Sequence, residues 1–263
     1  MDKLDKSKAS SSSNKNEETS KKERIAKVMA RAGLCSRRDA EKWIESGSVE
    51  VNGNVLVTPA HTVGPEDKIV VDGKILPTHE RTRLFLYHKP AGLVTTRRDE
   101  QGRTTIFDKF PAEFPRTVSV GRLDINTEGL LLLTNDGELS RYLELPQTGI
   151  SRTYRVRVHG KVYQDRLDNL KKGIRYDGVR YGSIDARLDE GEKKEGSNAW
   201  LNVTLREGKN REVRKVMDAV GLTVNRLIRT SYGPFHLGNL DRGAILEVKY
   251  SQLISMLPEY FKK

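Results

Sequence analysis

Four consecutive leucines, Leu130 to Leu133, constrain this chain more than any other feature. A glycine-bounded polar segment, 121–129, leads directly into them, and an Asn-Asp-Gly turn signal follows at 135–137. An apolar run this short between turn signals indicates a buried element with polar loops at both ends. Asp124 is therefore expected at the edge of a core, where a carboxylate is costly unless a cation pairs with it. An aspartate that closes a turn or caps a helix is the alternative for this residue taken alone.

The balance of charge favours a polyanionic partner. The chain has 263 residues and a formal net charge of +11, of which only +2 lies within residues 1–22. Positive charge that is spread over folded domains most often meets nucleic acid. A basic protein that is simply soluble is the alternative reading of the charge alone.

Several classes of protein are disfavoured by what the sequence lacks. Cys35 is the only cysteine, so a disulfide framework and a thiolate metal site are excluded. The five histidines show no metal-binding spacing, and we expect no metal and no cofactor. No apolar run approaches the roughly 18–20 residues that span a bilayer. The N-terminus has no apolar signal core, so a cytoplasmic location is expected.

Composition divides the chain into two folded regions. Residues 1–22 hold too few apolar side chains to offset the entropy of ordering, which predicts a disordered tail. Two regions of apolar patterning follow, and a mixed-charge segment with a proline separates them. The predicted organisation is a tail at 1–22, a small domain at 23–75, a linker at 76–83, a large domain at 84–250 and a C-terminal tail at 251–263.

The small domain is expected to contain an αα-hairpin followed by β-strands. Apolar residues of 25–32 recur at i, i+3, i+4 and i+7, which predicts one helix. Ser36, with an aspartate three residues later, predicts the capped start of a second helix. Valine-rich segments flank Asn52-Gly53, which is a strong hairpin signal, and the segment 69–73 adds a further strand and turn.

Cations lie away from the apolar stripes of these two helices. They are Lys27, Arg31, Arg37 and Arg38. Such an array suits the phosphate backbone of RNA, although a solvated charged face would look the same. The residues 34–40 together with Val51-Asn52-Gly53 resemble an S4 domain, a small RNA-binding module. This resemblance covers about residues 23–75 and implies that the four cations bind RNA.

The large domain mixes strands and helices without a regular βαβ rhythm. Strands are predicted at 84–87, 154–158 and 201–205, and a helix is predicted over the apolar stripe of 213–220. The charged segment 189–198 is expected to form a surface loop. This order predicts an α+β domain with a mixed, largely antiparallel sheet flanked by helices.

The string from Gly121 to Gly137 resembles the active-site motif of one branch of ribosomal RNA pseudouridine synthases. This branch comprises the type A enzymes, which act on the small ribosomal subunit, together with types B, E and F, which act on the large one. The resemblance implies that Asp124 is the catalytic carboxylate and that no cofactor is required. Asn210-Arg211-Glu212-Val213-Arg214 and Leu227-Ile228-Arg229 look most similar to type B.

The resemblance also assigns partners to Asp124. The segment 207–214 is similar to the family motif Glu-Gly-x-x-x-x-Val-Arg, in which the final arginine, here Arg214, pairs with the catalytic aspartate. A solvated helix start is the alternative for this segment. Ser151-Arg152-Thr153-Tyr154 resembles the Lys-x-Tyr motif, whose tyrosine, here Tyr154, stacks on the target uracil. A core aromatic residue is the alternative for Tyr154.

Further cations are expected to contact the substrate RNA. They are Lys89, Arg122, Arg152 and Arg211. Arg152 stands where the family has lysine, so the charge is kept but the geometry differs. Lys89, within a Lys-Pro-x-Gly string, could instead contact backbone.

The sequence thus predicts a monomeric pseudouridine synthase that modifies a uridine of ribosomal RNA, with the 23S large-subunit RNA as the expected substrate. The alternatives are a small-subunit enzyme of the same branch and a non-catalytic S4 protein that assists ribosome assembly. An aminoacyl-tRNA synthetase with an S4 domain is disfavoured, because its signature strings are missing and the chain is short for that role.

Overall fold

The computed structural model describes residues 22–78, 80–189 and 198–262. The chain forms two compact units, Met1–Thr78 and His79–Lys263, and each is described by itself. Residues 1–21 of the predicted tail and 190–197 of the predicted charged loop lie outside the described residues. Within the described part of the chain, no helix combines the length and apolar character that a membrane crossing requires.

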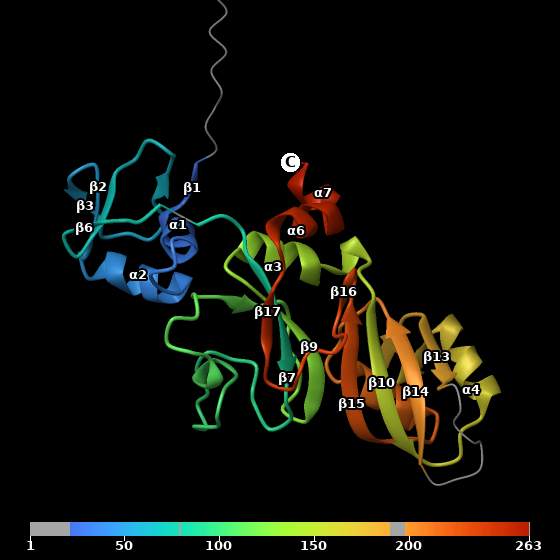
Figure 1. Ribbon diagram of the computed structural model, residues 1–263. Coiled ribbons are helices and arrows are strands. Elements are labelled where there is room, and N and C mark those ends of the chain that lie inside the picture. Colours follow the sequence, from blue (N-terminus) through green and yellow to red (C-terminus); the bar gives the residue numbers. More distant parts are fainter. Residues whose placement is uncertain (1–21, 79, 190–197, 263) are drawn as a thin grey trace, which may run out of the picture. The chain divides into compact units, whose positions relative to one another are not determined.

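The first unit has two helices and two small antiparallel sheets (Figure 1). The four-stranded sheet has the order β3-β2-β5-β6, and β1 pairs with β4. The elements are α1 (Ile25–Arg31), α2 (Arg37–Glu45), β1 (Glu23–Arg24), β2 (Val49–Val51), β3 (Asn54–Val55), β4 (Thr62–Val63), β5 (Ile69–Val71) and β6 (Lys74–Ile75). This is the predicted αα-hairpin followed by strands.

Local chemistry fixes the helix start and the hairpins of this unit. Ser36 Oγ accepts a 3.1 Å hydrogen bond from the backbone N–H of Asp39, and the Asp39 carboxylate accepts one from the N–H of Ser36. This reciprocal pair is the predicted capping box of α2. Asn52 and Gly53 both have positive φ, 53° and 81°, as a two-residue turn between β2 and β3 requires.

The core of the first unit joins the helices to the sheet. Ile25, Met29, Ile44 and Val49 are fully buried in one cluster, and Leu76 packs against it. Because Leu76 belongs to this core, the first unit continues to the start of the segment that was predicted as a linker.

The second unit is built on one large mixed sheet with the main strand order β13-β14-β10-β15-β9-β7-β17. Its strands are β7 (Leu84–Lys89), β8 (Val118–Ser119), β9 (Thr127–Thr134), β10 (Arg152–His159), β13 (Ile184–Leu188), β14 (Asn198–Leu205), β15 (Thr223–Tyr232), β16 (Phe235–His236) and β17 (Ile245–Glu247), with β11 (Ile174–Tyr176) and β12 (Val179–Tyr181) forming a separate hairpin. Its helices are α3 (Gly137–Glu144), α4 (Gln164–Asn169), α5 (Glu212–Ala219), α6 (Tyr250–Met256) and α7 (Pro258–Phe261). Among the named strands that the structure describes, β9 and β15 form a parallel pair and the other pairs are antiparallel. The α+β prediction is confirmed.

The leucine run forms the central strand β9, and all eight of its residues are buried. Its side chains alternate between two faces, as the pleat of a strand requires. Leu130 and Leu132 pack with α3, α6 and Tyr232, whereas Leu131 and Leu133 pack with an aromatic group that includes Phe110. The sheet is therefore covered on both sides at β9, which explains why the run is continuously apolar.

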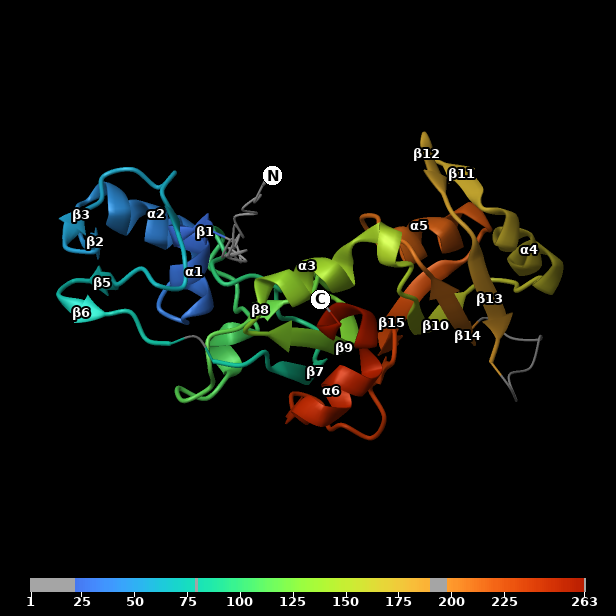
Figure 2. The ribbon, with the colours of Figure 1, turned by 90° about the horizontal axis from the view of Figure 1, so that it is seen from above.

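A third apolar cluster lies under α4 and α5. Both helices lie on the same side of strands β10, β14 and β15 (Figure 2). Val216 and Met217 of α5 are fully buried there, together with Val156 and Leu201 of the sheet. This cluster fixes the start of α5 against the sheet, and that start carries several residues of the candidate site.

Two predicted boundaries are corrected by the structure. The segment 251–263 was expected to be a tail, but its described residues form α6 and α7; Leu253 of α6 and Leu257 between the helices are buried in the cluster that contains Leu130 and Leu132. Thr82 and Arg83, expected in the linker, are bonded to the turn after β9: the Thr82 hydroxyl donates to Asp136, and the Arg83 N–H donates to the Asn135 side chain, each at 2.8 Å.

Candidate active site

A cavity of about 180 Å³ opens where the loop before β9 meets β10, β15 and the loop from β14 to α5. Its walls include Asp124, Tyr154, Arg229 and Glu212. Four separate stretches of sequence therefore supply its polar side chains. The sheet and α5 hold these stretches in place, because the apolar cluster under α4 and α5 packs α5 against β10, β14 and β15.

Asp124 lies in the loop between β8 and β9, at the edge of the core as the sequence predicted. Its carbonyl oxygen accepts a 2.9 Å hydrogen bond from the N–H of Thr127, which closes the loop as a turn. Its side chain is 33% exposed, so the carboxylate is within reach of a ligand in the cavity. The nearest cation is Arg211, with Nη1 3.7 Å from Asp124 Oδ2.

Arg214 reaches the same loop by a different contact. Its Nη2 donates to the carbonyl oxygen of Asn126 at 3.3 Å, and its Nη1 donates to that of Val224 at 3.1 Å. Within the described part of the chain, the direct ion pair of Asp124 is made by Arg211 and not by Arg214, which differs from the prediction. Burial lowers the pKa of Arg214, as does Arg211, and the charge of Asp124 opposes this effect.

Lys89 contacts backbone, which was the alternative to the RNA contact predicted for it. This lysine at the end of β7 is fully buried, and its ammonium donates to the carbonyl oxygens of Thr127 at 2.9 Å, Pro90 at 3.0 Å, and Asp124 and Ile125 at 3.3 Å. Burial lowers its pKa to about 8, although the charges of Asp124 and Glu128 act in the opposite direction. Lys89 therefore braces the backbone of the loop that carries Asp124.

Tyr154 is half-buried near the start of β10. It stands opposite Arg229 of β15, and a bulge between Thr153 and Tyr154 shifts the register there. Its ring packs against two apolar clusters of the second unit and lines the cavity as well. Asp124 and Tyr154, which the sequence grouped together, thus meet at one cavity.

Arg152 also differs from its predicted role as an RNA contact, because only 6% of it is exposed. Its Nη1 donates to the carbonyl oxygens of Ile150 and Arg206 at 2.9 Å, and its Nη2 donates to the Tyr232 hydroxyl at 2.8 Å. The guanidinium also lies over the Tyr232 ring, 4.8 Å from its centroid. Arg152 therefore links three segments of the chain beside the cavity, at Ile150, Arg206 and Tyr232.

Arg122 and Arg211 are exposed at the mouth of the cavity. Both also line a wider groove of about 860 Å³, whose other wall is the segment 94–103. Cations in an open groove beside Asp124 are suited to phosphate contacts. The RNA contacts predicted for these two arginines remain predictions.

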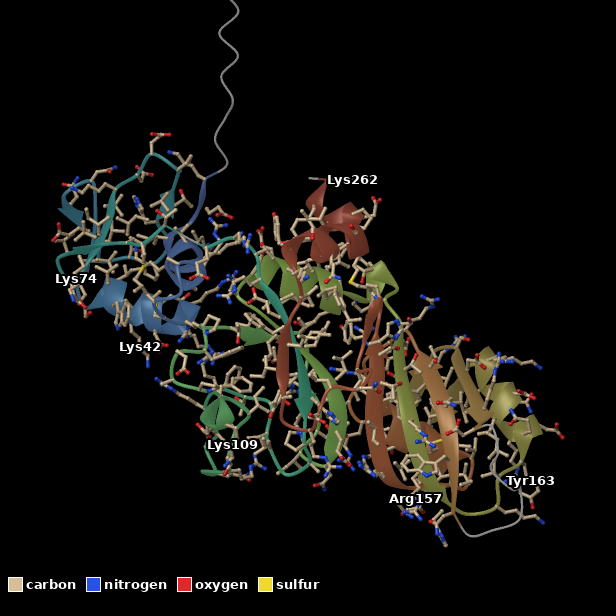
Figure 3. The ribbon with its side chains drawn as sticks, in the orientation of Figure 1. Lys42, Lys74, Lys109, Arg157, Tyr163 and Lys262 are labelled. Carbon is tan, nitrogen blue, oxygen red and sulfur yellow. The ribbon has the colours of Figure 1, made fainter. Side chains whose placement is uncertain are left out.

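The four predicted cations of the first unit fall into two groups. Lys27 and Arg31 both pair with Glu23, at 2.5 Å and 2.7 Å. Arg37 and Arg38 at the start of α2 are exposed, and within the described ranges no ion pair involves them. Lys42 of the same helix projects outward (Figure 3). The outer surface of α2 is thus the more available cationic surface.

Glu212, the first residue of α5, was not singled out by the sequence. It is 4% exposed, and its Oε2 accepts a 2.9 Å hydrogen bond from the N–H of Lys209, whereas Oε1 has no partner among the described residues. Burial raises its pKa to about 7, the hydrogen bond from Lys209 opposes this, and the neighbouring Glu207 raises it further. The available signal was a glutamate that stands directly beside Arg211 and among further cations at 209, 214 and 215.

Arg229 is the second cavity residue without a predicted role. It is 3% exposed, its Nε donates a 2.7 Å hydrogen bond to the carbonyl oxygen of Leu130, and its Nη2 has no partner among the residues described. Arg229 stands in the string Leu227-Ile228-Arg229, which resembles the type B enzymes, but the sequence assigned it no role. In the described ranges no group of three or more His, Cys, Asp or Glu side chains could hold a metal ion.

The fold and the cavity agree with comparisons to known proteins. The sequence profile of RNA pseudouridylate synthases matches residues 83–219, and that of the S4 domain matches residues 23–69. The chain belongs to the RNA pseudouridylate synthase family, and it carries an N-terminal S4 domain. It is thus an isomerase that acts on RNA, as the sequence predicted.

Individual relatives are similar over most of their length. An RNA pseudouridine synthase of Rickettsia felis, named as uncharacterized, is 44% identical over 226 residues, which cover 86% of this chain and 96% of the relative. Ribosomal large subunit pseudouridine synthase B of Salmonella typhi is 41% identical over 254 residues, with 92% and 86% covered. A crystal structure of a pseudouridylate synthase shares 26% identity with a TM-score of 0.62, and 89% of this chain and 99% of that chain are covered.

Proposed function

We propose that this enzyme converts a uridine of large-subunit ribosomal RNA to pseudouridine and that Asp124 is its catalytic carboxylate. The observation that carries the assignment is the meeting of Asp124 and Tyr154 at one cavity, where Asp124 is the carboxylate beside an exposed guanidinium. The 41% identity to a relative named as a large-subunit enzyme supports the choice of RNA. The enzyme is proposed to act as a monomer.

The reaction needs only one well-placed carboxylate. The bond between ribose C1′ and uracil N1 breaks, the base turns, and a new bond joins C1′ to C5. The proton on C5 is released and N1 gains a proton, so the product is an isomer of the substrate. An ionised aspartate can act as the nucleophile or as the proton acceptor. Asp124 fills either role, because its carboxylate is exposed to the cavity while its backbone is fixed.

Tyr154 and two arginines are proposed to assist Asp124. A base that is taken out of the RNA stack needs a new stacking surface, which the half-buried ring of Tyr154 supplies. Arg211 pairs with the carboxylate, with Nη1 3.7 Å from Oδ2, and holds it at the mouth of the cavity. Arg214 binds the carbonyl oxygen of Asn126 in the Asp124 loop and that of Val224 in β15, so that its guanidinium orients Asp124 through the backbone.

The S4 domain and the groove beside the cavity are proposed to hold the rest of the RNA. The outer surface of α2 offers Arg37 and Arg38, and the groove offers Arg122 and Arg211. Contacts between these cations and phosphates would offset the few kcal/mol that base flipping costs.

Mapping of pseudouridines tests the proposal. Ribosomal RNA from a strain that lacks this gene should miss one pseudouridine in the large-subunit RNA, and the purified enzyme should restore it in the extracted RNA. A missing site in the small-subunit RNA would identify the other substrate of this branch. An unchanged pattern in both RNAs would contradict the proposed function.

A further inference from the structure

We propose that Arg229 reads the target base, by donating a hydrogen bond from Nη2 to a carbonyl oxygen of the pyrimidine that enters the cavity. The inference rests on the proposed function and extends it to base recognition. It starts from the burial of a guanidinium in the wall of the cavity with one nitrogen left unpaired.

The guanidinium of Arg229 has a hydrogen-bond donor that a ligand could satisfy. In the part of the chain that the structure describes, no carboxylate lies within ion-pair distance of the Arg229 guanidinium. Its Nε donates to the carbonyl oxygen of Leu130. The guanidinium also lies over Tyr232, 5.0 Å from the ring centroid. Among the described residues, Nη2 is buried and has no hydrogen-bond partner. A buried donor without an acceptor costs about 1–3 kcal/mol, and the group is retained at low cost only if a ligand supplies the acceptor.

The position of Arg229 is fixed by the sheet. Its backbone lies against Gly129 of β9, so closely that a Cβ on Gly129 would come within 2.3 Å of the Arg229 carbonyl oxygen. The Nε bond to Leu130 then sets the direction of the side chain. The guanidinium is therefore held before a ligand arrives, and binding does not have to order it.

Arg229 and Tyr154 are neighbours on one face of the sheet. They are opposite residues of β15 and β10, and both line the cavity. Opposite residues of paired strands have Cβ atoms about 4.5–5.5 Å apart. A pyrimidine stacked on Tyr154 would thus present its edge to Arg229.

The chemistry of the pair suits a carbonyl oxygen. A guanidinium has donors and no acceptor, so it can bind O2 or O4 of uracil but not the N–H at position 3. Cytosine carries an amino group where uracil has O4, so a contact with O4 would also reject cytidine. Asp124, which lines the same cavity, pairs with Arg211 and not with Arg229, and its 33% exposed side chain is accessible to the reacting sugar or base.

The test pairs changes in the enzyme with changes in single atoms of the RNA. Short ribosomal RNA substrates are made with uridine, 2-thiouridine or 4-thiouridine at the target, because sulfur accepts hydrogen bonds more weakly than oxygen. Single-turnover rates are measured for the wild-type enzyme, for Arg229→Lys and, as the matched control, for Arg152→Lys. Arg152 is also buried and lies over Tyr232, but both of its terminal nitrogens have partners.

We expect one thio substitution to slow the wild-type enzyme by about 10-fold and to have little further effect in Arg229→Lys, whereas Arg152→Lys keeps the wild-type sensitivity. The sensitive position identifies O2 or O4. Equal rates of the wild type on all three substrates would overturn the inference without any variant. Sensitivity that persists unchanged in Arg229→Lys would overturn it as well, while conversion of the unmodified RNA by the wild type would leave the proposed function intact.

Discussion

The ammonium of Lys89 donates a 2.9 Å hydrogen bond to the carbonyl oxygen of Thr127, just beyond the loop that carries Asp124. The same ammonium also binds the carbonyl oxygens of Asp124 and Ile125. One buried cation therefore binds three backbone carbonyl oxygens in and beside the Asp124 loop. The position of the Asp124 carboxylate depends on this lysine, although the two side chains form no ion pair in the described part of the chain.

Replacing Lys89 by methionine should loosen this loop. The side chain keeps its length, but the carbonyl oxygens of the loop lose their donor, at a cost of about 1–3 kcal/mol for each group left unsatisfied. We expect a lower free energy of unfolding and a fall of about 10²-fold in the single-turnover rate, since small displacements of a reacting group are costly. Lys109→Met is the control, because Lys109 is exposed (Figure 3) and should change neither quantity. A normal rate in Lys89→Met would contradict the bracing role.

Glu212 should make stability depend on pH. Its pKa is about 7 in the folded protein and near 4.5 in the unfolded chain, so the folded state binds the extra proton between these values. The stabilisation is complete below pH 4.5 and is lost as the pH rises through 7. In Glu212→Gln this dependence should flatten, by on the order of 1–3 kcal/mol between pH 5 and pH 8 in urea unfolding. Glu207→Gln should keep part of the slope, because burial raises the pKa of Glu212 more than the charge of Glu207 does. An unchanged pH dependence of stability in Glu212→Gln would refute the account.

Gly129→Ala should disrupt the pairing of β9 with β15. The added Cβ would lie 2.3 Å from the Arg229 carbonyl oxygen, at a residue whose φ is +101°. Overpacking together with the strained backbone should cost about 3–5 kcal/mol in denaturant unfolding. Gly178→Ala is the matched control, because its φ is +73° but its Cβ would meet no atom within 4 Å, which predicts a cost of about 1–2 kcal/mol. Equal losses of unfolding free energy in the two variants would mean that the close approach of Gly129 to Arg229 does not determine the cost.

Arg214 and Arg37 should give opposite phenotypes. Arg214→Lys keeps the charge but cannot span the carbonyl oxygens of Asn126 and Val224, so RNA affinity should stay near normal while the rate falls by about 10²-fold. Arg37→Ala should leave the rate at saturation unchanged and reduce the salt slope of binding by about one counterion. Filter binding at several salt concentrations, together with single-turnover rates, measures both. Reduced affinity with a normal rate in both variants would make Arg214 one more RNA contact.

The sequence was sufficient where local patterns decide the outcome. The leucine run between turn signals predicted a buried element that follows the polar Asp124 segment, and the Asn52-Gly53 pair predicted a hairpin turn. Both depend on a few consecutive residues, so that one sequence shows them directly.

The sequence was insufficient where the fold brings distant groups together. Lys89 and Arg152 were expected to contact RNA, but backbone carbonyl oxygens from distant parts of the chain, such as those of Thr127 and Arg206, bind them instead. The choice between Arg211 and Arg214 depends on the left-handed backbone of Arg211, at φ 52°, which directs its side chain at Asp124. The C-terminal helices were missed because each has only one or two turns, and their stability comes from the core that they cover.

The most direct test of the central claim is the tritium released by Asp124→Asn. The reaction frees the proton on C5, so RNA that contains 5-tritiated uridine reports each turnover. Asparagine keeps the shape of the side chain and removes its charge. We expect wild-type RNA binding and a rate reduced by at least about 10³-fold. Release of tritium at a rate close to that of the wild type would show that another group performs the reaction and would contradict the assignment of Asp124.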